Sequence, residues 1–303
     1  MPRTHFQPWK FLLAASLLLV CASGLLLARY RPVSLTASPA AKTLAAMPPV
    51  MLWAWERPED LTHIDPQKAG VAYLANTIYL DGTAYRSRPR LQPLRVADGT
   101  WLMAVVRIES LPHAHAVPAI SEAQSDPLNS PLKDITPTTS NNPLAPYTQS
   151  QLDTAVHDIV EVAQAQGVHA VQIDFDARHS ERAFYAALIR EVRKNLPPDV
   201  PLSITALAGW CFADHWIEGL PVDEAVPMLF QMGRETKDIR ARLSDGEDFA
   251  PASCRLSLGI ATDETLPRVP SGRRIYLFHN HSPWTQQNIA QAMKISEDIH
   301  AQH

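Results

Sequence analysis

Short apolar runs recur along the chain from residue 50 onward, and segments with helical spacing separate several of them. The runs that we predict to be strands are 50–55, 70–80, 101–108, 168–175, 202–208, 225–230, 256–261 and 275–278. Strands that alternate with helices pair in parallel. Eight such strands over about 250 residues predict an α/β fold, a closed TIM-type (β/α)8 barrel.

The intervening segments support the same interpretation, with one irregularity. Apolar residues at helical spacing predict amphipathic helices at 149–166, 181–196 and 286–299, and Pro197 ends the second of these. Residues 81–100 offer no helical pattern, so we expect an extended or hairpin excursion at 85–96 and an irregular second βα unit. Residues 111–147 form the longest irregular stretch.

The N-terminus carries an unbroken apolar run at 11–28, which follows Arg3 and Lys10. Eighteen residues at helical rise span about 27 Å, enough for one transmembrane helix. We therefore divide the chain into a signal-anchor or signal peptide at 1–31, a tether rich in Ala, Pro, Ser and Thr at 32–49, and a barrel at 50–303. The expected location is the inner membrane with the barrel in the periplasm, or secretion if the leader is cleaved.

Composition excludes some classes of function. The net charge is −4 without a basic block, so we expect no nucleic-acid partner. Only 11 glycines accompany 26 prolines, which disfavours a glycine-rich phosphate loop, and we expect no cofactor. Cys211 and Cys254 fall at the exit of one strand and the entrance of another. We expect these ends of a barrel to be too far apart for a disulfide.

The fourth predicted strand carries the sharpest chemical signal. With period-two alternation, Gln172, Asp174 and Asp176 share one face, and the apolar face must pack against helices. Both carboxylates therefore point into the barrel near its mouth. Close like charges raise the pKa of one carboxyl group, as a general acid requires. We identify Asp176 as a candidate catalytic residue and Asp174 as a supporting or structural carboxylate.

This segment resembles the strand-four motif of the chitinase-like glycoside hydrolase family eighteen, Asp-x-x-Asp-x-Asp-x-Glu. The likeness rests on residues 173–176, which read IDFD. In that family the final Glu is the catalytic acid on a (β/α)8 barrel. Here Arg178 occupies the Glu position and Val171 occupies the first Asp position.

A second resemblance covers nearly the whole predicted barrel. The segments that carry it read WAWERPEDL at 53–61, VQIDFDA at 171–177 with SER at 180–182, LSITALA at 202–208 with WC at 210–211, and DEAVPMLF at 223–230. Together they resemble a bacterial family known only as domain of unknown function 3142. That resemblance implies a barrel related to glycosidases and an export signal, with no established activity.

A glycosidase would need another acid in place of the missing Glu. Glu56, at the exit of the first strand, is the first candidate, and Glu109, at the exit of the third, is the second. A retaining mechanism places the two carboxyl groups about 5–5.5 Å apart and an inverting one about 6.5–9.5 Å apart. A salt bridge from Glu56 to Arg57 is the structural alternative.

Aromatic and amide side chains at other strand exits favour a sugar ligand. Sugar rings stack on aromatic faces, and their hydroxyl groups need planar polar partners. The candidate binding residues of these two kinds are Trp53, Trp55, Trp210, Trp284, Gln231 and Asn280. Core packing is the alternative for any single tryptophan.

Two His-x-His pairs, His113/His115 and His279/His281, raise a metal site as a further possibility. Zinc needs three or four converging ligands, and the fifth and sixth predicted strands offer Trp210 and Gln231 instead of histidines. We therefore expect no metal. The sequence leaves three functions open: a glycoside-hydrolase-like enzyme, a barrel that binds a glycan or a partner without cleaving it, and a metal-dependent hydrolase.

Overall fold

The computed structural model describes residues 37–110, 144, 146–265 and 268–301, and residues 38–303 form one compact unit. The predicted leader and most of the irregular stretch at 111–147 lie outside the described residues. Within the described part of the chain, no helix has both the length and the apolar character needed to cross a bilayer.

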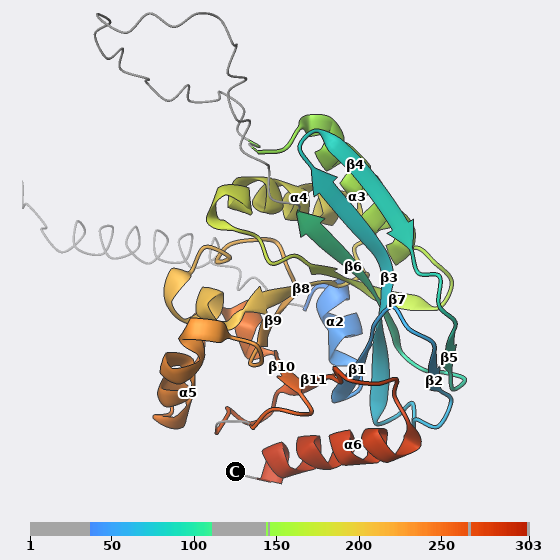
Figure 1. The fold of residues 1–303 in the computed structure, drawn as a ribbon, viewed down its shortest axis with the longest axis vertical. Coiled ribbons are helices and arrows are strands. Elements are labelled where there is room, and N and C mark those ends of the chain that lie inside the picture. The colour runs from blue at the N-terminus through green and yellow to red at the C-terminus, as the bar shows by residue number, and fades with distance from the viewer. Residues whose placement is uncertain (1–36, 111–143, 145, 266–267, 302–303) are drawn as a thin grey trace, which may run out of the picture. The chain divides into compact units, whose positions relative to one another are not determined.

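Eight parallel strands close into a barrel (Figure 1). In chain order the barrel strands are β1 (Val50–Ala54), β3 (Ala69–Asp81), β6 (Leu102–Ser110), β7 (Val168–Asp174), β8 (Leu202–Leu207), β9 (Glu224–Met228), β10 (Ser257–Ala261) and β11 (Arg274–Phe278). Each of these strands pairs with the next along the chain, and β11 pairs with β1 to complete the ring. The predicted closed parallel barrel is confirmed.

The helices around the barrel are α3 (Gln149–Ala163), α4 (Arg182–Asn195), α5 (Thr236–Ser244) and α6 (Gln286–Ala301). Helix α3 begins with a capping box, in which Thr148 and Gln151 bond to each other's backbone N–H groups. The prediction missed α5, a short helix with only two buried residues. After β8 the chain forms a single π-helical turn, Trp210–Asp214, in place of a regular helix.

The second βα unit is irregular, as predicted. Strand β3 pairs with β1 over Ala69–Tyr73, passes a register shift between Leu74 and Asn76, and then pairs with antiparallel β4 (Ala84–Pro89). The hairpin covers the edge that β3 exposes where it leaves the barrel wall. Strand β5 (Leu94–Val96) then pairs with β2 (Glu59–Leu61), a short strand in the connection from β1 to β3.

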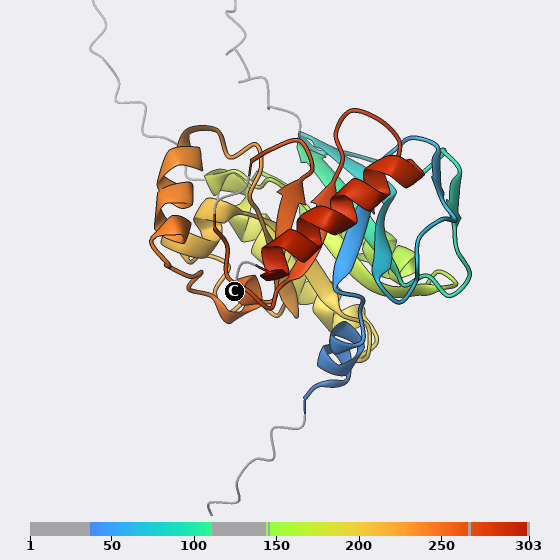
Figure 2. The same cartoon turned by 90° about the horizontal axis from the view of Figure 1, so that it is seen from below.

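The predicted tether is partly wrong. Helix α2 (Pro39–Ala45) lies at one end of the barrel (Figure 2), and its Leu44 packs with Met47 in the cluster that fills the barrel interior. Arg274 of β11 donates to the carbonyl oxygens of Leu44 at 2.7 Å and Pro48 at 3.1 Å. The folded unit therefore begins at Ser38 rather than at residue 50. The alanine-rich composition concealed a short helix with one apolar side.

A hydrogen-bonded network crosses the barrel interior. The Glu224 side chain is fully buried and accepts bonds from Arg274 at 3.0 Å, Tyr276 at 2.6 Å and Ser203 at 3.1 Å. Ser203 accepts a bond from Gln172 Nε2 at 3.0 Å. Because every one of these buried polar groups has a partner, the interior tolerates a charge that would otherwise be strongly unfavourable.

The prediction that Cys211 and Cys254 are too far apart to bridge is wrong, because they form a disulfide with a Cα–Cα distance of 6.1 Å. Cys211 lies in the π-helical turn after β8, and Cys254 lies in the 3-10 turn Ala252–Arg255 before β10. Each cysteine therefore lies in a turn next to a strand rather than in the strand itself. The Ala250 N–H donates to the Cys211 carbonyl at 3.0 Å, so the segment before β10 lies against the turn.

Candidate ligand-binding cavity

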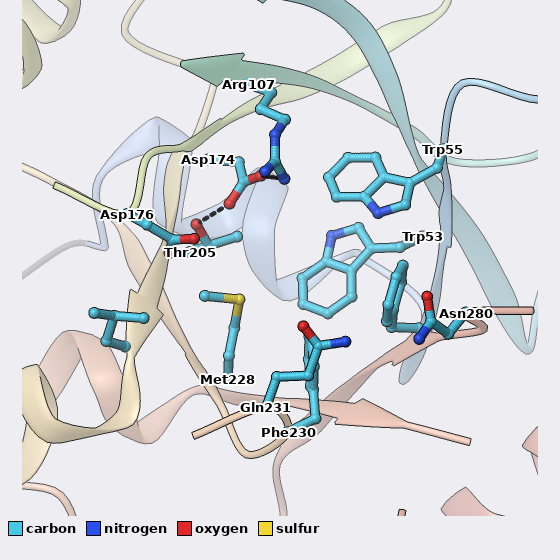
Figure 3. Close-up of a pocket in the computed structure, with 12 residues that line it drawn as sticks. Trp53, Trp55, Arg107, Asp174, Asp176, Thr205, Met228, Phe230, Gln231 and Asn280 are labelled. Atoms are coloured by element: carbon cyan, nitrogen blue, oxygen red, sulfur yellow. Dashed lines mark hydrogen bonds and ion pairs between the residues drawn. The ribbon is translucent and has the colours of Figure 1, made fainter. Parts of the chain in front are cut away.

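A cavity of about 330 Å³ lies where the carboxyl ends of the barrel strands converge (Figure 3). Its lining residues belong to, or closely follow, every barrel strand except β3 and β10. They are Trp53, Trp55, Arg107, Asp174, Asp176, Thr205, Leu207, Met228, Phe230, Gln231, Phe278 and Asn280. This is the end of a parallel barrel at which ligand sites form, because the loops that follow the strands converge there.

One wall of the cavity is aromatic. The ring of Trp53 is buried, and its centroid lies 6.1 Å from that of Phe230. Its indole N–H donates to Gln172 Oε1 at 2.8 Å, which ties the wall to the interior network. Trp55 is half-buried and meets Phe278 edge to face at 6.1 Å. The sequence predicted that at least one of these two tryptophans lines the mouth. Both line the cavity, and Trp55 is the one that retains an accessible surface.

Asp174 is buried, and Figure 3 shows its contacts with Arg107 and Thr205. Its Oδ2 lies 3.1 Å from Arg107 Nη1, and its Oδ1 accepts a bond from the Thr205 hydroxyl at 2.7 Å. Arg107 also donates to Glu109 at 3.0 Å. These contacts satisfy Asp174 within the protein, which is the structural alternative that the sequence left open for it.

Asp176 lies two residues beyond Asp174 and is exposed on the cavity wall. No hydrogen bond to its carboxylate comes from the residues that the structure describes. Partial desolvation by the surrounding protein, together with the charge of Asp174, raises the pKa of Asp176, and Arg107 opposes the shift. The sequence argument about two neighbouring carboxylates predicted the direction of this shift.

Two amides stand on the opposite side of the opening. Gln231 and Asn280 are exposed and line the cavity, as predicted. Gln231 adopts a φ of 51°, in the left-handed region that few residues other than glycine adopt. Its backbone N–H donates to Glu264 Oε1 at 3.0 Å, which holds the turn in place. Backbone strain of this kind is common where a side chain must be aimed at a ligand.

A second cavity, of about 250 Å³, adjoins the first on the β6–β7 side. It shares Arg107, Asp174 and Asp176 with the first cavity, and Glu109 and Arg178 contribute to its remaining wall. Glu109 therefore lies next to the main cavity rather than in it. The shared residues form a common wall between the two cavities.

The structure does not bring Glu56 to the cavity lining. Its Oε1 accepts the backbone N–H groups of Leu91 at 3.1 Å and Gln92 at 3.2 Å, and its Oε2 lies 3.9 Å from Arg88. These partners belong to the β4–β5 excursion, which the sequence pattern could not place in space. The predicted carboxylate pair of Glu56 and Asp176 is therefore not assembled around the cavity.

Two of the four predicted tryptophans are also absent from the cavity. Trp210 is buried and packs edge to face on Trp216, with the ring centroids 5.0 Å apart. Trp284 is buried, and its indole N–H donates to the Trp53 carbonyl at 2.8 Å. Both are core residues in the layer outside the strands, which is the alternative that the sequence left open for them.

Several lining residues were missed although the alternation along their strands contained a signal for them. In β6 the residues Met103 and Val105 face the interior, so alternation places Arg107 there as well. In β8 the polar Thr205 alternates with apolar neighbours in the same way. Phe230 and Phe278 follow Met228 and Tyr276 by two residues and pack in the same interior cluster, so the alternation points to them as well.

The histidine pairs do not form a metal site in the described part of the chain. His113 and His115 lie outside it. His279 contacts the hydroxyls of Thr262 at 2.7 Å and Ser282 at 2.9 Å, and His281 lies 2.9 Å from Asp263. Within the described residues, the group with metal-binding spacing is His157, Asp158 and Glu161 on α3, away from the cavity.

Comparison with known proteins finds a partial match to one family model and no relative of known activity. No curated protein and no solved structure matches the chain significantly. Residues 139–229 match the family model described as Domain of unknown function (DUF3142). This range includes α3, β7, α4, β8 and β9, and with them Asp174, Asp176 and Thr205 of the cavity. The segment that carries both cavity aspartates is therefore similar to the DUF3142 family model.

Proposed function

We propose that this barrel binds a carbohydrate in the cavity at the carboxyl ends of its strands. The observation that carries the proposal is the composition of the cavity wall. An accessible aromatic face, Trp55, stands with the carboxylate of Asp176 and the amides of Gln231 and Asn280 around one opening. This combination serves a ligand with apolar C–H faces and many hydroxyl groups.

Export to the periplasm by means of the N-terminal apolar run is part of the proposal. The apolar run at 11–28 has the length of a membrane span or signal. The disulfide between Cys211 and Cys254 supports the same location, because disulfides persist in oxidising compartments and are rare in the cytosol.

Glycoside hydrolysis is the second candidate function. Asp176 favours it, because a carboxyl group with a raised pKa beside an ionised neighbour can act as a general acid. Binding without cleavage is favoured by Asp174, which is held by Arg107, and by Arg178 at the position of the acid in chitinase-like enzymes. The likeness to those enzymes remains part of the proposal. A metal-dependent hydrolase receives no support from the groups around the cavity.

Calorimetric titration of the purified full chain with a panel of neutral, acidic and amino oligosaccharides tests the proposal. We expect at least one series to bind, and Trp55→Ala to weaken its binding by about tenfold or more, the loss of roughly one stacking contact. Trp101→Ala is the matched control, because Trp101 lies at the start of β6, far from the strand ends that line the cavity.

The same samples separate the two candidate functions. Release of reducing ends that is lost in Asp176→Asn supports hydrolysis. Binding without release in the parent protein supports a barrel that only binds. The absence of binding across the whole panel contradicts the carbohydrate proposal.

A further inference from the structure

The two adjoining cavities indicate a groove rather than a single pocket. They share Arg107, Asp174 and Asp176, so a ligand that contacts this common wall from the main cavity can continue directly into the second one. The main cavity is lined on one side by aromatic rings, whereas the second is lined mainly by charged side chains. A chain of at least two sugar residues would therefore experience different chemistry in each cavity.

The charges on these walls are unequally compensated. Arg107 bonds to Asp174 and Glu109 at the same time, at 3.1 Å and 3.0 Å. Arg178 lies 3.8 Å from the buried Glu181. Each arginine thus already faces a carboxylate. Asp176 has no cation within ion-pair distance among the described residues, although it borders both cavities.

This imbalance selects the class of ligand. A carboxylated sugar would bring a further negative charge to a wall on which carboxylates outnumber guanidinium groups. A neutral sugar would leave Asp176 uncompensated. A protonated amino group would supply the missing cation and could also donate hydrogen bonds to the carboxylate. The raised pKa of Asp176 agrees, because it shows that the present surroundings disfavour the charged form.

We propose that the two cavities form one groove for a linear glycan that contains amino sugars, with Asp176 on the shared wall as the counter-ion of a sugar ammonium group. This inference rests on the proposed carbohydrate function and narrows its substrate class. It assigns Asp176 a binding role that does not depend on whether the glycan is cleaved.

Three series of sugars, from the monomer to the β-1,4-linked hexamer, test the inference by titration of the full chain at neutral pH. The probes are glucosamine oligomers, their fully N-acetylated counterparts and glucose oligomers. We expect the glucosamine series to bind at least about tenfold more tightly than the other two, as one compensated charge provides. The preference should decrease as salt is added. Affinity should also increase from the monomer to the oligomers, because both cavities become occupied.

Asp176→Asn is the decisive variant, because it removes the charge and keeps the shape of an exposed side chain. It should abolish the preference, so that the glucosamine oligomers bind the variant no more tightly than the glucose oligomers do. Asp199→Asn is the matched control, since Asp199 is an exposed aspartate that precedes β8 at the opposite end of the barrel.

The outcomes separate this inference from the function on which it rests. Equal affinity for the three series, or an equal loss for all three in Asp176→Asn, overturns the amino-sugar assignment and leaves carbohydrate binding intact. If none of the three series binds but another sugar of the wider panel does, the assignment is again overturned alone. If no sugar of either panel binds, both the amino-sugar assignment and the carbohydrate proposal are overturned.

Discussion

The ring of Trp53 in β1 lies directly against the backbone of Gly259 in β10, across the barrel interior. A Cβ atom on Gly259 would lie 2.9 Å from Trp53 Cη2, closer than packed carbon atoms approach each other. The glycine therefore makes room for the tryptophan that forms the inner part of the aromatic wall.

Gly259→Ala should consequently destabilise the protein by about 1–3 kcal/mol, the usual effect of adding a methyl group to a packed interior. Urea unfolding measures the change in the free energy of unfolding. Because Phe is smaller than Trp, adding Trp53→Phe to the Gly259→Ala variant should recover part of the lost stability. If the two substitutions change the free energy of unfolding additively, the contact between Trp53 and Gly259 is not the cause of the loss.

Arg107 should contribute to stability through Asp174. Arg107→Met leaves the buried Asp174 carboxylate with Thr205 as its remaining close partner. We expect the free energy of unfolding to fall by about 3 kcal/mol. This is the lower end of the range for a broken buried ion pair, because Arg107 itself is partly exposed.

Two comparisons check the origin of that loss by chemical denaturation. Asp174→Asn in the Arg107→Met background should restore part of the stability, because the uncompensated charge is removed. Arg95→Met, which breaks the exposed pair with Asp60, should cost less than about 1 kcal/mol. A similar loss for Arg95→Met and Arg107→Met would contradict the assigned role of the buried charge.

The raised pKa of Asp176 predicts a stability effect with a definite sign. An unfolded chain ionises Asp near pH 3.9, whereas the folded protein ionises Asp176 at a higher pH. Well below pH 3.9 the group is protonated in both states. Between about pH 3.9 and the folded pKa the unfolded chain ionises first, so the folded protein loses stability as the pH rises, and the loss is complete above the folded pKa.

Asp176→Asn should therefore raise the melting temperature at pH 7, and this gain should shrink as the pH falls toward about 3.9. Thermal unfolding of the variant and the parent protein across this range provides the measurement. A variant that is less stable than the parent at pH 7 would mean that the Asp176 carboxylate is stabilised in the folded protein.

The disulfide should stabilise the barrel by constraining the unfolded chain. Cys211 and Cys254 are 43 residues apart in sequence, and a closed loop of this length contributes about 4 kcal/mol in the chain-entropy description. Replacing both cysteines by Ala should lower the free energy of unfolding by a comparable amount. Thiol titration of the unfolded, unreduced protein should detect neither Cys211 nor Cys254; full reactivity of both would contradict the bridge.

The order of the strands and the direction of their interior residues were predictable from the sequence. Alternation of apolar and polar residues in β7 correctly placed Asp174 inside the barrel and Asp176 at its mouth, because strand geometry fixes both directions. The same rule applied to β6 would have identified Arg107. These inferences depend only on local backbone geometry.

Some positions beyond the strand ends were not predictable, because loop paths depend on tertiary contacts. The predicted site at Glu56 was wrong for this reason. Glu56 lies in the turn after β1, and Arg90 holds this turn by donating to the carbonyl oxygens of Trp55 and Arg57. Cys211 and Cys254 were misjudged in the same way, since turns carry both away from the direction of their strands.

A structure of the full chain with a bound oligosaccharide tests the central claim most directly. The account predicts a sugar ring stacked on Trp55, with a polar group of the ligand within hydrogen-bond distance of the Asp176 carboxylate. An oligosaccharide bound anywhere else on the protein, with this cavity empty at saturating ligand, would contradict it.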